Sequence, residues 1–248
     1  DQRWAGALAQ AAARQQLWLQ LYGGAVATSR EVLSGQSPSM CSLRRTVEKL
    51  APTDVNVLIL GESGVGKERV ARALHEASGR KRLVALTCAA IPKDLLEAEL
   101  FGVEKGAFTG ALKSRPGLVE QAAGGTLLLD EIGEMDLALQ PKLLRFLESR
   151  GARRVGSEQE YRSNARLIAA TNRDLQAESH HNRFRLDLYF RLAEISLSVP
   201  PLRERSEDIP GLVQTFLRLA NERFGKNVEC VDPALIQQMQ AYSWPGNV

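Results

Sequence analysis

The stretch that decides the fold is Val55-Asn56-Val57-Leu58-Ile59-Leu60, followed by Gly61-Glu62-Ser63-Gly64-Val65-Gly66-Lys67-Glu68. A short apolar run passes through a glycine-rich turn into a helical pattern over about 67–78. Such a turn aims backbone N–H groups at phosphate oxygens, and the N-terminus of the following helix favours the same anion. Lys67 is placed to reach the outer phosphates of a nucleotide, but Glu68 stands where the usual motif has a Ser or Thr that binds Mg²⁺. The stretch therefore predicts a phosphate-binding loop with one unusual residue.

Outward from this loop, strand patterns alternate with helical patterns. The strands are near-continuous apolar runs, typical of a parallel sheet covered on both faces, and further ones are expected at 83–87, 126–129, 167–170 and 195–199. Helical patterns separate them at about 136–150 and 184–192. This alternation predicts a doubly wound α/β domain at 39–200. Helical patterns at about 208–224 and 233–242 predict a small α-helical second domain at 201–248.

The N-terminal part of the chain has a different pattern. Residues 1–22 are rich in Ala, Leu and Gln and are expected to form a helix, either a short coiled coil or a helix packed on its own domain. Gly23-Gly24 and the turn residues around Pro38 predict a linker at 23–38. The chain opens at Asp1 without a methionine, as expected for a piece of a longer protein.

Composition excludes several classes of protein. Of the 248 residues, 32 are basic and 29 acidic, so the net charge of +3 is too small to predict a nucleic-acid partner by itself. No run approaches the ~20 consecutive apolar residues that a membrane span needs, so no membrane partner is expected. Cys41, Cys88 and Cys230 lack the spacing of a zinc site, and without a signal peptide they indicate a reduced, cytoplasmic protein.

An apolar run at 127–129 ends in two carboxylates, Asp130 and Glu131. At the end of a strand, Asp130 can hold Mg²⁺ through water, while Glu131 can orient and polarise an attacking water. An acidic pair alone is more often part of a solvated loop, but the phosphate-binding loop upstream favours the catalytic interpretation. The run at 167–170 ends in Thr171-Asn172. A polar side chain at this strand end could sense the terminal phosphate, but as an isolated feature it is a weak signal.

The segment Gly106-Ala107-Phe108-Thr109-Gly110-Ala111 surrounds one phenylalanine with small residues. Because glycine tolerates positive φ, the segment suits a flexible surface loop with an aromatic tip. It also suits an ordinary turn with Phe108 packed into the core, and the residues alone favour this second interpretation.

Together these motifs resemble the AAA+ domain of bacterial enhancer-binding proteins, the activators of sigma-54-dependent transcription. The resemblance covers about residues 34–248 and includes Glu99-Leu100-Phe101-Gly102, Gly124-Gly125-Thr126 and Pro201-Leu202-Arg203-Glu204-Arg205. It implies a P-loop AAA+ fold whose α-helical lid is incomplete here. It also implies an ATP hydrolase that uses Mg²⁺, works as a hexamer and remodels the closed complex of the sigma-54 RNA polymerase holoenzyme. The loop at 106–111 would contact sigma-54, and an acidic residue at position 68 is common in this family.

The resemblance also implies roles for residues at matching positions. Lys67 would bind phosphate, Asp130 would serve Mg²⁺, Glu131 would activate water, and Asn172 would be the first sensor. Thr87 stands where many relatives have an Asn that holds the catalytic glutamate away from water until the partner engages. A threonine side chain has a shorter reach, so the coupling of hydrolysis to the partner is left open.

Arg185 and Arg191 resemble the arginines that reach the nucleotide of the neighbouring subunit. Relatives continue beyond Val248 with a second sensor arginine, and their DNA-binding helix-turn-helix domain would also lie outside this chain, so DNA contact is expected only there. Two alternatives stay open. One is a different AAA+ remodeller, against which the loop at 106–111 argues. The other is a regulatory scaffold that binds ATP but hydrolyses little of it. The threonine at position 87, where many relatives have Asn, is the reason to retain this alternative.

Overall fold

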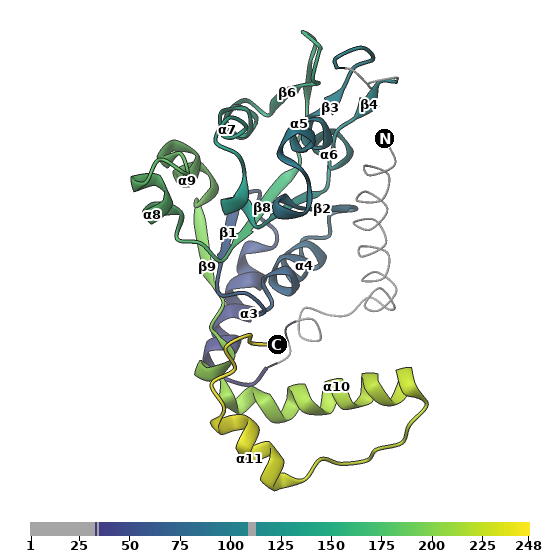
Figure 1. The fold of residues 1–248 in the computed structure, drawn as a ribbon, viewed down its shortest axis with the longest axis vertical. Helices are drawn as coiled ribbons and strands as arrows, with labels where there is room; N and C mark the ends of the chain where they lie inside the picture. Colours follow the sequence, from purple (N-terminus) through teal and green to yellow (C-terminus); the bar gives the residue numbers. More distant parts are fainter. Residues whose placement is uncertain (1–32, 34, 109–112) are drawn as a thin grey trace.

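The structure is a computed structural model, and it describes residues 33, 35–108 and 113–248. Its centre is a five-stranded sheet whose neighbouring strands are all parallel. In spatial order the strands are β2 (Leu83–Thr87), β5 (Thr126–Asp130), β8 (Arg166–Thr171), β1 (Val57–Leu60) and β9 (Ile195–Ser198) (Figure 1). The helix predicted at 1–22 and most of the linker predicted at 23–38 lie outside the described residues.

Helices cover both faces of the sheet and give the fold three layers (Figure 1). One face carries α3 (Pro38–Leu50) and α4 (Lys67–Ala77), and the other carries α5 (Lys93–Phe101), α7 (Gln140–Ser149) and α9 (Leu186–Leu192). Successive side chains of a strand point to opposite faces, so each strand supplies both cores. In β5, for example, Leu127 and Leu129 enter one core and Leu128 the other. The doubly wound α/β fold predicted from the sequence is confirmed.

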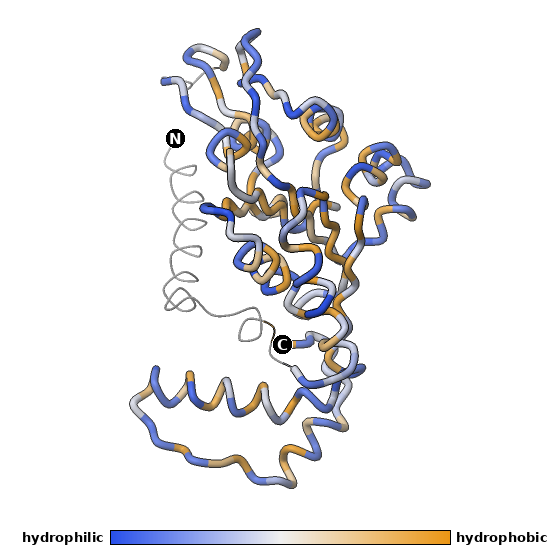
Figure 2. Tube along the Cα trace, turned by 180° about the vertical axis from the view of Figure 1, so that it is seen from behind, coloured by the Kyte–Doolittle hydropathy of each residue, from blue (hydrophilic) through white to orange (hydrophobic). Residues whose placement is uncertain are grey.

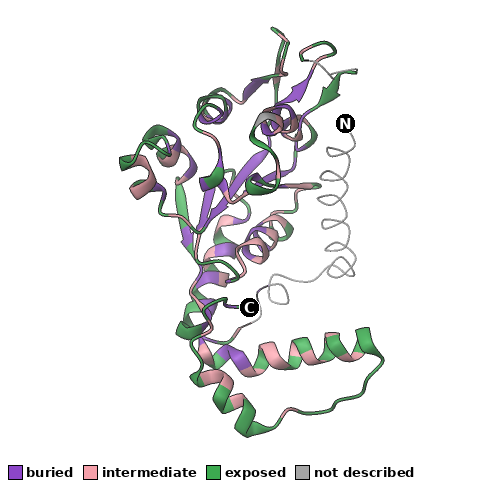
Figure 3. Cartoon of the chain, viewed as in Figure 1, coloured by how far each residue is buried: buried purple, intermediate pink, exposed green. Residues whose placement is uncertain are grey.

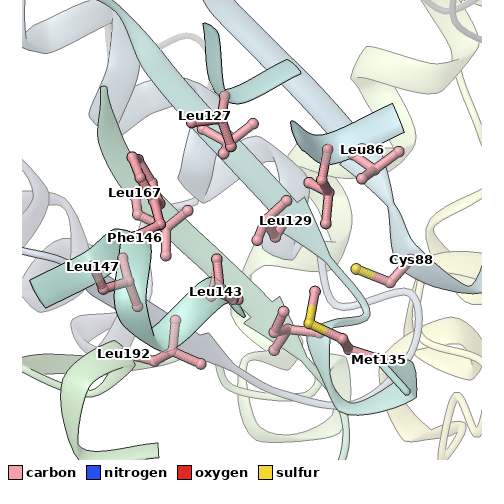
Figure 4. Close-up of a cluster of buried hydrophobic side chains, with 14 of the residues drawn as sticks. Leu86, Cys88, Leu127, Leu129, Met135, Leu143, Phe146, Leu147, Leu167 and Leu192 are labelled. Atoms are coloured by element: carbon pink, nitrogen blue, oxygen red, sulfur yellow. The ribbon is translucent and has the colours of Figure 1, made fainter. Parts of the chain in front are cut away.

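The larger core lies between the sheet and α7. Phe146 and Leu143 of α7 lie against Leu127 and Leu129 of β5 and Leu167 of β8, all essentially without exposed surface (Figure 4). Burying one such side chain contributes about 1.5–3 kcal/mol relative to leaving it exposed. The strands of the sheet are accordingly hydrophobic in Figure 2, whereas the outer hairpin of β6 (Gly151–Arg153) and β7 (Glu160–Arg162) is mostly hydrophilic.

Several element boundaries differ from the pattern. The helix expected from 136 begins at Gln140, with Pro141 in its first turn, where the missing N–H has no helical partner in any case. Strand β1 begins at Val57, because Asn56 before it is held by the carboxylate of Glu194. Short elements that the pattern missed complete the domain: α6 (Leu118–Gln121), α8 (Leu175–His180), and the two-residue strands β3 (Gly102–Val103) and β4 (Arg115–Pro116).

After β9 the chain leaves the sheet for a pair of helices. The turns η3 (Leu202–Glu204) and η4 (Ser206–Asp208) lead into α10 (Ile209–Phe224) and α11 (Pro233–Ala241), which project away from the sheet (Figures 1 and 3). Within α10 only Ile209 is buried, and α11 has no buried residue. None of the helices in the described part of the chain has the length and apolar character needed to cross a membrane.

Candidate active site

The predicted phosphate loop joins the end of β1 to the start of α4. Three of its glycines have backbone angles that favour glycine, with φ of +156° at Gly61, +77° at Gly64 and +100° at Gly66. The first two also lack space for a side chain, since a Cβ would approach the carbonyl oxygen of Val199 to 2.9 Å at Gly61 and that of Gly246 to 2.2 Å at Gly64. The glycines therefore allow a tight loop at the N-terminus of α4, where the helix dipole favours an anion.

Lys67 is the first residue of α4, and its side chain folds back over the loop. Its ammonium donates hydrogen bonds to the carbonyl oxygens of Gly61 at 2.8 Å and Glu62 at 2.9 Å. Burial lowers the pKa of Lys67, while the nearby carboxylates of Asp130 and Glu131 partly oppose that shift. The ammonium thus lies within the field of the acidic pair at the end of β5.

The acidic pair sits where β5 ends. A carboxylate oxygen of Asp130 accepts a hydrogen bond from the N–H of Glu131 at 3.0 Å, and Glu131 has a φ of +52°. A left-handed conformation is uncommon for a glutamate and marks a backbone strain of the kind found at functional sites. Burial raises the pKa of Asp130, and burial together with these two carboxylates raises the pKa of the neighbouring Cys88 to about 12. The Cys88 side chain is buried in the core beside the acidic pair.

One cavity of about 390 Å³ brings these groups together. Its polar part comprises the loop from Ser63 to Gly66 with Lys67, Glu68, Arg69, Asp130, Glu131 and Arg205. Its apolar part extends under the lid helix α10 and is formed by Leu33, Met40, Val65, Val199, Leu212 and Phe216. A cavity with a phosphate loop at one end and an apolar slot at the other suits a nucleotide.

Two predicted residues lie at the same edge of the sheet but outside the cavity. Thr87 ends β2 and is the register partner of Asp130 in β5, whereas Asn172 directly follows β8, whose last residue Thr171 is in register with Leu60. Both Thr87 and Asn172 are exposed. The parallel order of the strands therefore gathers Thr87 and Asn172 at the carboxyl edge where the phosphate loop begins, as expected for ligand sites of open α/β sheets.

Arg185 and Arg191 lie away from the cavity. The Arg185 guanidinium forms an ion pair with Asp187 at 2.7 Å, and Arg191 donates to the carbonyl oxygen of Leu147 at 3.2 Å. Helix α9, which carries Arg191, occupies the outer edge of the molecule (Figure 1). Neither arginine lines the wall of the cavity that holds Lys67.

The predicted surface loop leaves the small hairpin of β3 and β4. Phe108 is 43% exposed, so the interpretation of a turn with this side chain packed into the core is wrong. Thr109, Gly110 and Ala111 lie outside the described residues. At the base of the loop, the carboxylate of Glu104 accepts hydrogen bonds from Ser114 and, at 2.9 Å, from Arg154 of the segment that joins β6 and β7. The guanidinium of Arg154 also forms an ion pair with Glu120 at 3.0 Å.

Three residues hold the phosphate loop from the lid side, and none of them was assigned a role from the sequence, although two belong to the motif at 201–205. Arg203 forms an ion pair with Glu62 at 2.6 Å and, with Asn247, lowers the pKa of Glu62 to about 2. Arg205 donates to the carbonyl oxygen of Val65 at 2.8 Å, and the side chain of Asn247 reaches the carbonyl oxygen of Ser63 at 3.0 Å. Nothing in the local sequence of these residues indicates contacts so far away along the chain.

Comparison with known proteins agrees with this geometry. The family model for the Sigma-54 interaction domain matches residues 33–198, and that for the AAA+ ATPase lid domain matches residues 203–248. The transcriptional regulatory protein ZraR of Klebsiella oxytoca is 51% identical over 216 residues, covering 86% of this chain and 49% of ZraR. The anaerobic nitric oxide reductase transcription regulator NorR of Citrobacter koseri is 47% identical over 251 residues, covering 98% of this chain and 50% of NorR.

Solved structures give the same result. The crystal structure of NtrX from Brucella abortus in complex with ADP superposes with a TM-score of 0.81 and 38% identity, over 87% of this chain and 47% of that one. The chain spans about half the length of the curated relatives it matches. The chain belongs to the Sigma-54 interaction domain family and is an AAA+ ATPase.

Proposed function

We propose that the chain hydrolyses Mg-ATP as one subunit of a homohexameric ring and that the ring remodels the closed complex of the sigma-54 RNA polymerase holoenzyme. The observation that carries this proposal is the cavity in which the phosphate loop and Lys67 face Asp130 and Glu131. The structures of NtrX in complex with ADP and with ATP, which this chain resembles, support nucleotide binding by this fold. The AAA+ domain would occupy 39–200 and the lid 201–248, and the protein would act in the cytoplasm, as its transcription-regulator relatives suggest.

In this proposal the phosphates of ATP lie on the loop. The backbone N–H groups and the ammonium of Lys67 hold them, with the ammonium turning from the loop carbonyls to the phosphates. Glu131 orients and polarises the attacking water, for which its place beside Asp130 is suited. Asn172 at the end of β8 reports on the terminal phosphate, and Thr87 contacts the glutamate from β2.

The acidic residues of the cavity fit a magnesium ion. Burial raises the pKa of both Asp130 and Glu68, and the charge of Asp130 adds to the rise at Glu68. Both carboxylates therefore lie where a hard divalent cation would favour their ionised form, and carboxylate oxygens are ligands that Mg²⁺ prefers. When bound with ATP, Mg²⁺ neutralises charge on the phosphates. We propose that Asp130 holds it and that Glu68 takes the place of the usual hydroxyl.

The remaining residues act between molecules. Arg185 and Arg191, outside their own subunit's cavity, would approach the phosphates bound by a neighbour, where such arginines contribute roughly 10³–10⁵-fold in rate. The exposed Phe108 and the residues around it at 106–111 would contact sigma-54. The ion pairs of Arg154 with Glu104 and Glu120 tie the base of this loop to the β6–β7 hairpin, which gives the loop a firm support.

Two measurements test the proposal. A phosphate-release assay should show turnover that depends on both ATP and Mg²⁺, and a pull-down should show that the chain retains sigma-54 in a nucleotide-dependent way. ATP binding without turnover would favour a regulatory scaffold. Turnover without any retention of sigma-54 would favour a different AAA+ remodeller.

A further inference from the structure

Every carbonyl oxygen of the phosphate loop at 61–66 accepts a hydrogen bond. Lys67 Nζ holds the first two carbonyls, at 2.8 and 2.9 Å, and the N–H of Val70 in α4 holds the last at 3.2 Å. The three middle carbonyls take their donors from the lid: Asn247 Nδ2 to Ser63 O at 3.0 Å, Val248 N to Gly64 O at 3.2 Å and Arg205 Nη2 to Val65 O at 2.8 Å. Half of the loop's carbonyls are therefore held from outside the sheet domain.

These bonds determine the direction of the loop's N–H groups. The C=O of one residue and the N–H of the next belong to one planar peptide unit and point in opposite directions. Holding the carbonyls of residues 63–65 toward the lid therefore turns the N–H groups of residues 64–66 to the other side of the loop. Within the part of the chain that the structure describes, none of these three N–H groups donates to a protein group. Successive N–H groups that point the same way form an anion-binding concavity.

Asn247 is the central contact between the lid and the loop. It is 4% exposed, its Oδ1 accepts from the N–H of Leu202 at 2.8 Å, and its Nδ2 also reaches the carboxylate of Glu62 at 3.1 Å. The same amide thus binds both the turn that opens the lid and the backbone of the loop. The C-terminal residues beside Asn247 pack closely against the loop, because a Cβ on Gly64 would lie only 2.2 Å from the carbonyl oxygen of Gly246.

We propose that Asn247 is a positioning residue for the phosphate chain of the nucleotide. It holds the carbonyl of Ser63 away from the anion site, and the loop's N–H groups then bind the phosphates. Because the donors to Ser63, Gly64 and Val65 all come from the lid, a lid that lifts from the loop releases these peptide units and weakens phosphate binding. Lid seating and phosphate affinity are thereby coupled. The inference rests on the proposed function only in taking the cavity as the ATP site.

The variant Asn247→Gly tests this role. Asn247 has a φ of +60°, which glycine adopts without strain, so the substitution removes the side chain and keeps the backbone. Calorimetric titration of the whole chain with ATP, ADP and adenosine should show about tenfold weaker binding of ATP and ADP, since hydrogen bonds of this kind contribute about 1 kcal/mol each. Binding of adenosine, which lacks phosphates, should stay within about twofold of the parent.

Asn221→Ala is the matched control. Asn221 is also a lid asparagine with bonds on both sides, donating to the carbonyl oxygen of Val228 at 2.8 Å and accepting from its N–H at 3.1 Å. It makes no contact with the phosphate loop, so its loss should leave all three affinities unchanged. If Asn247→Gly does not fold, Asn247→Asp keeps the acceptor for the N–H of Leu202 and removes the donor to Ser63 and to the carboxylate of Glu62. It should weaken ATP and ADP binding at least as much.

The outcomes separate the two hypotheses. A parent chain that fails to bind ATP contradicts the proposed function. A parent that binds ATP, with an Asn247 variant that binds ATP and ADP equally well, contradicts the positioning role. Equal weakening of adenosine and ATP also contradicts it, because a general disturbance of the lid would then be the cause.

Discussion

Thr87 and Asp130 are register partners at the carboxyl ends of β2 and β5, and Glu131 is the next residue after Asp130. This register places Thr87 at the end of the strand next to the one that ends in the acidic pair. Thr87 therefore lies beside the residue that precedes the candidate catalytic glutamate. The geometry supports a role for Thr87 in controlling Glu131, and it makes Glu131 the first residue to test.

Glu131→Gln should leave ATP affinity within about twofold and lower turnover by at least about 100-fold. The amide keeps the size of the side chain and cannot accept a proton from water, and general bases contribute typically 10²–10⁴-fold. Glu134→Gln is the matched control, because Glu134 is an exposed carboxylate on the same turn that pairs with Arg173 outside the cavity. Phosphate release and calorimetric binding check both variants, and turnover of Glu131→Gln within a few-fold of the parent would rule out this assignment.

Arg191→Ala and Glu131→Gln proteins, each inactive alone, should regain partial activity when mixed. Arg191 lies outside its own cavity, so we expect it to act on a neighbour's nucleotide. In mixed rings some interfaces then combine an intact Glu131 with an intact Arg191. Phosphate release across mixing ratios measures the rescue, and fluorescence transfer confirms subunit exchange. Exchange without rescue at any ratio would show that Arg191 acts within its own subunit.

Arg166→Met should lower the free energy of unfolding by about 3 kcal/mol. The Arg166 side chain is 1% exposed, and its guanidinium donates to the carbonyl oxygens of Leu50 at 3.0 Å and Ala51 at 2.9 Å. Methionine fills similar space and leaves these buried acceptors without donors, at about 1–3 kcal/mol each. Urea unfolding measures the change. The exposed Arg153→Met, which loses only a surface ion pair, should change stability by less than about 1 kcal/mol.

Stability should depend on pH through His75. Burial lowers the pKa of His75, and the cations Arg72, Arg80 and Arg166 lower it further. As the pH falls below about 6.5, the unfolded chain takes up a proton that the folded chain binds only at lower pH, so this residue's contribution to stability is present above pH 6.5 and lost on acidification. Urea unfolding at pH 7.5 and 5.5 should show a smaller acid loss for His75→Gln than for the parent. An identical loss in both would contradict the shifted pKa.

Much of the fold could be predicted because it depends on local signals. The buried strands read as apolar runs, and the glycines of the phosphate loop meet a backbone requirement that few other residues satisfy. The helix boundaries were less exact. Helix α7 begins at Gln140 and not at 136, because a turn follows Asp136. The short hairpins of β3–β4 and β6–β7 have no periodic pattern of apolar residues that would predict them.

The contacts of the site were harder to predict than its residues. Lys67 follows the glycine-rich loop at the start of α4, and Asp130 and Glu131 lie at the end of β5, where their types alone suggest a role. Asn247 lies in a turn with no such pattern, and its function depends on how the lid folds back over the loop. Phe108 was predicted wrongly from the residues alone. The small residues around it favour a turn with the side chain packed into the core, whereas the structure places Phe108 at the surface.

We propose that ATP hydrolysis in this cavity drives remodelling of sigma-54 RNA polymerase through Phe108, and open-complex formation is the assay that measures this coupling. Closed sigma-54 holoenzyme complexes on promoter DNA premelted near the start site should become heparin-resistant when the chain and ATP are added. Phe108→Ala should hydrolyse ATP within about twofold of the parent and yield no resistant complexes. Resistant complexes formed equally by the parent and by Phe108→Ala, or by neither while ATP is hydrolysed, would contradict the claim.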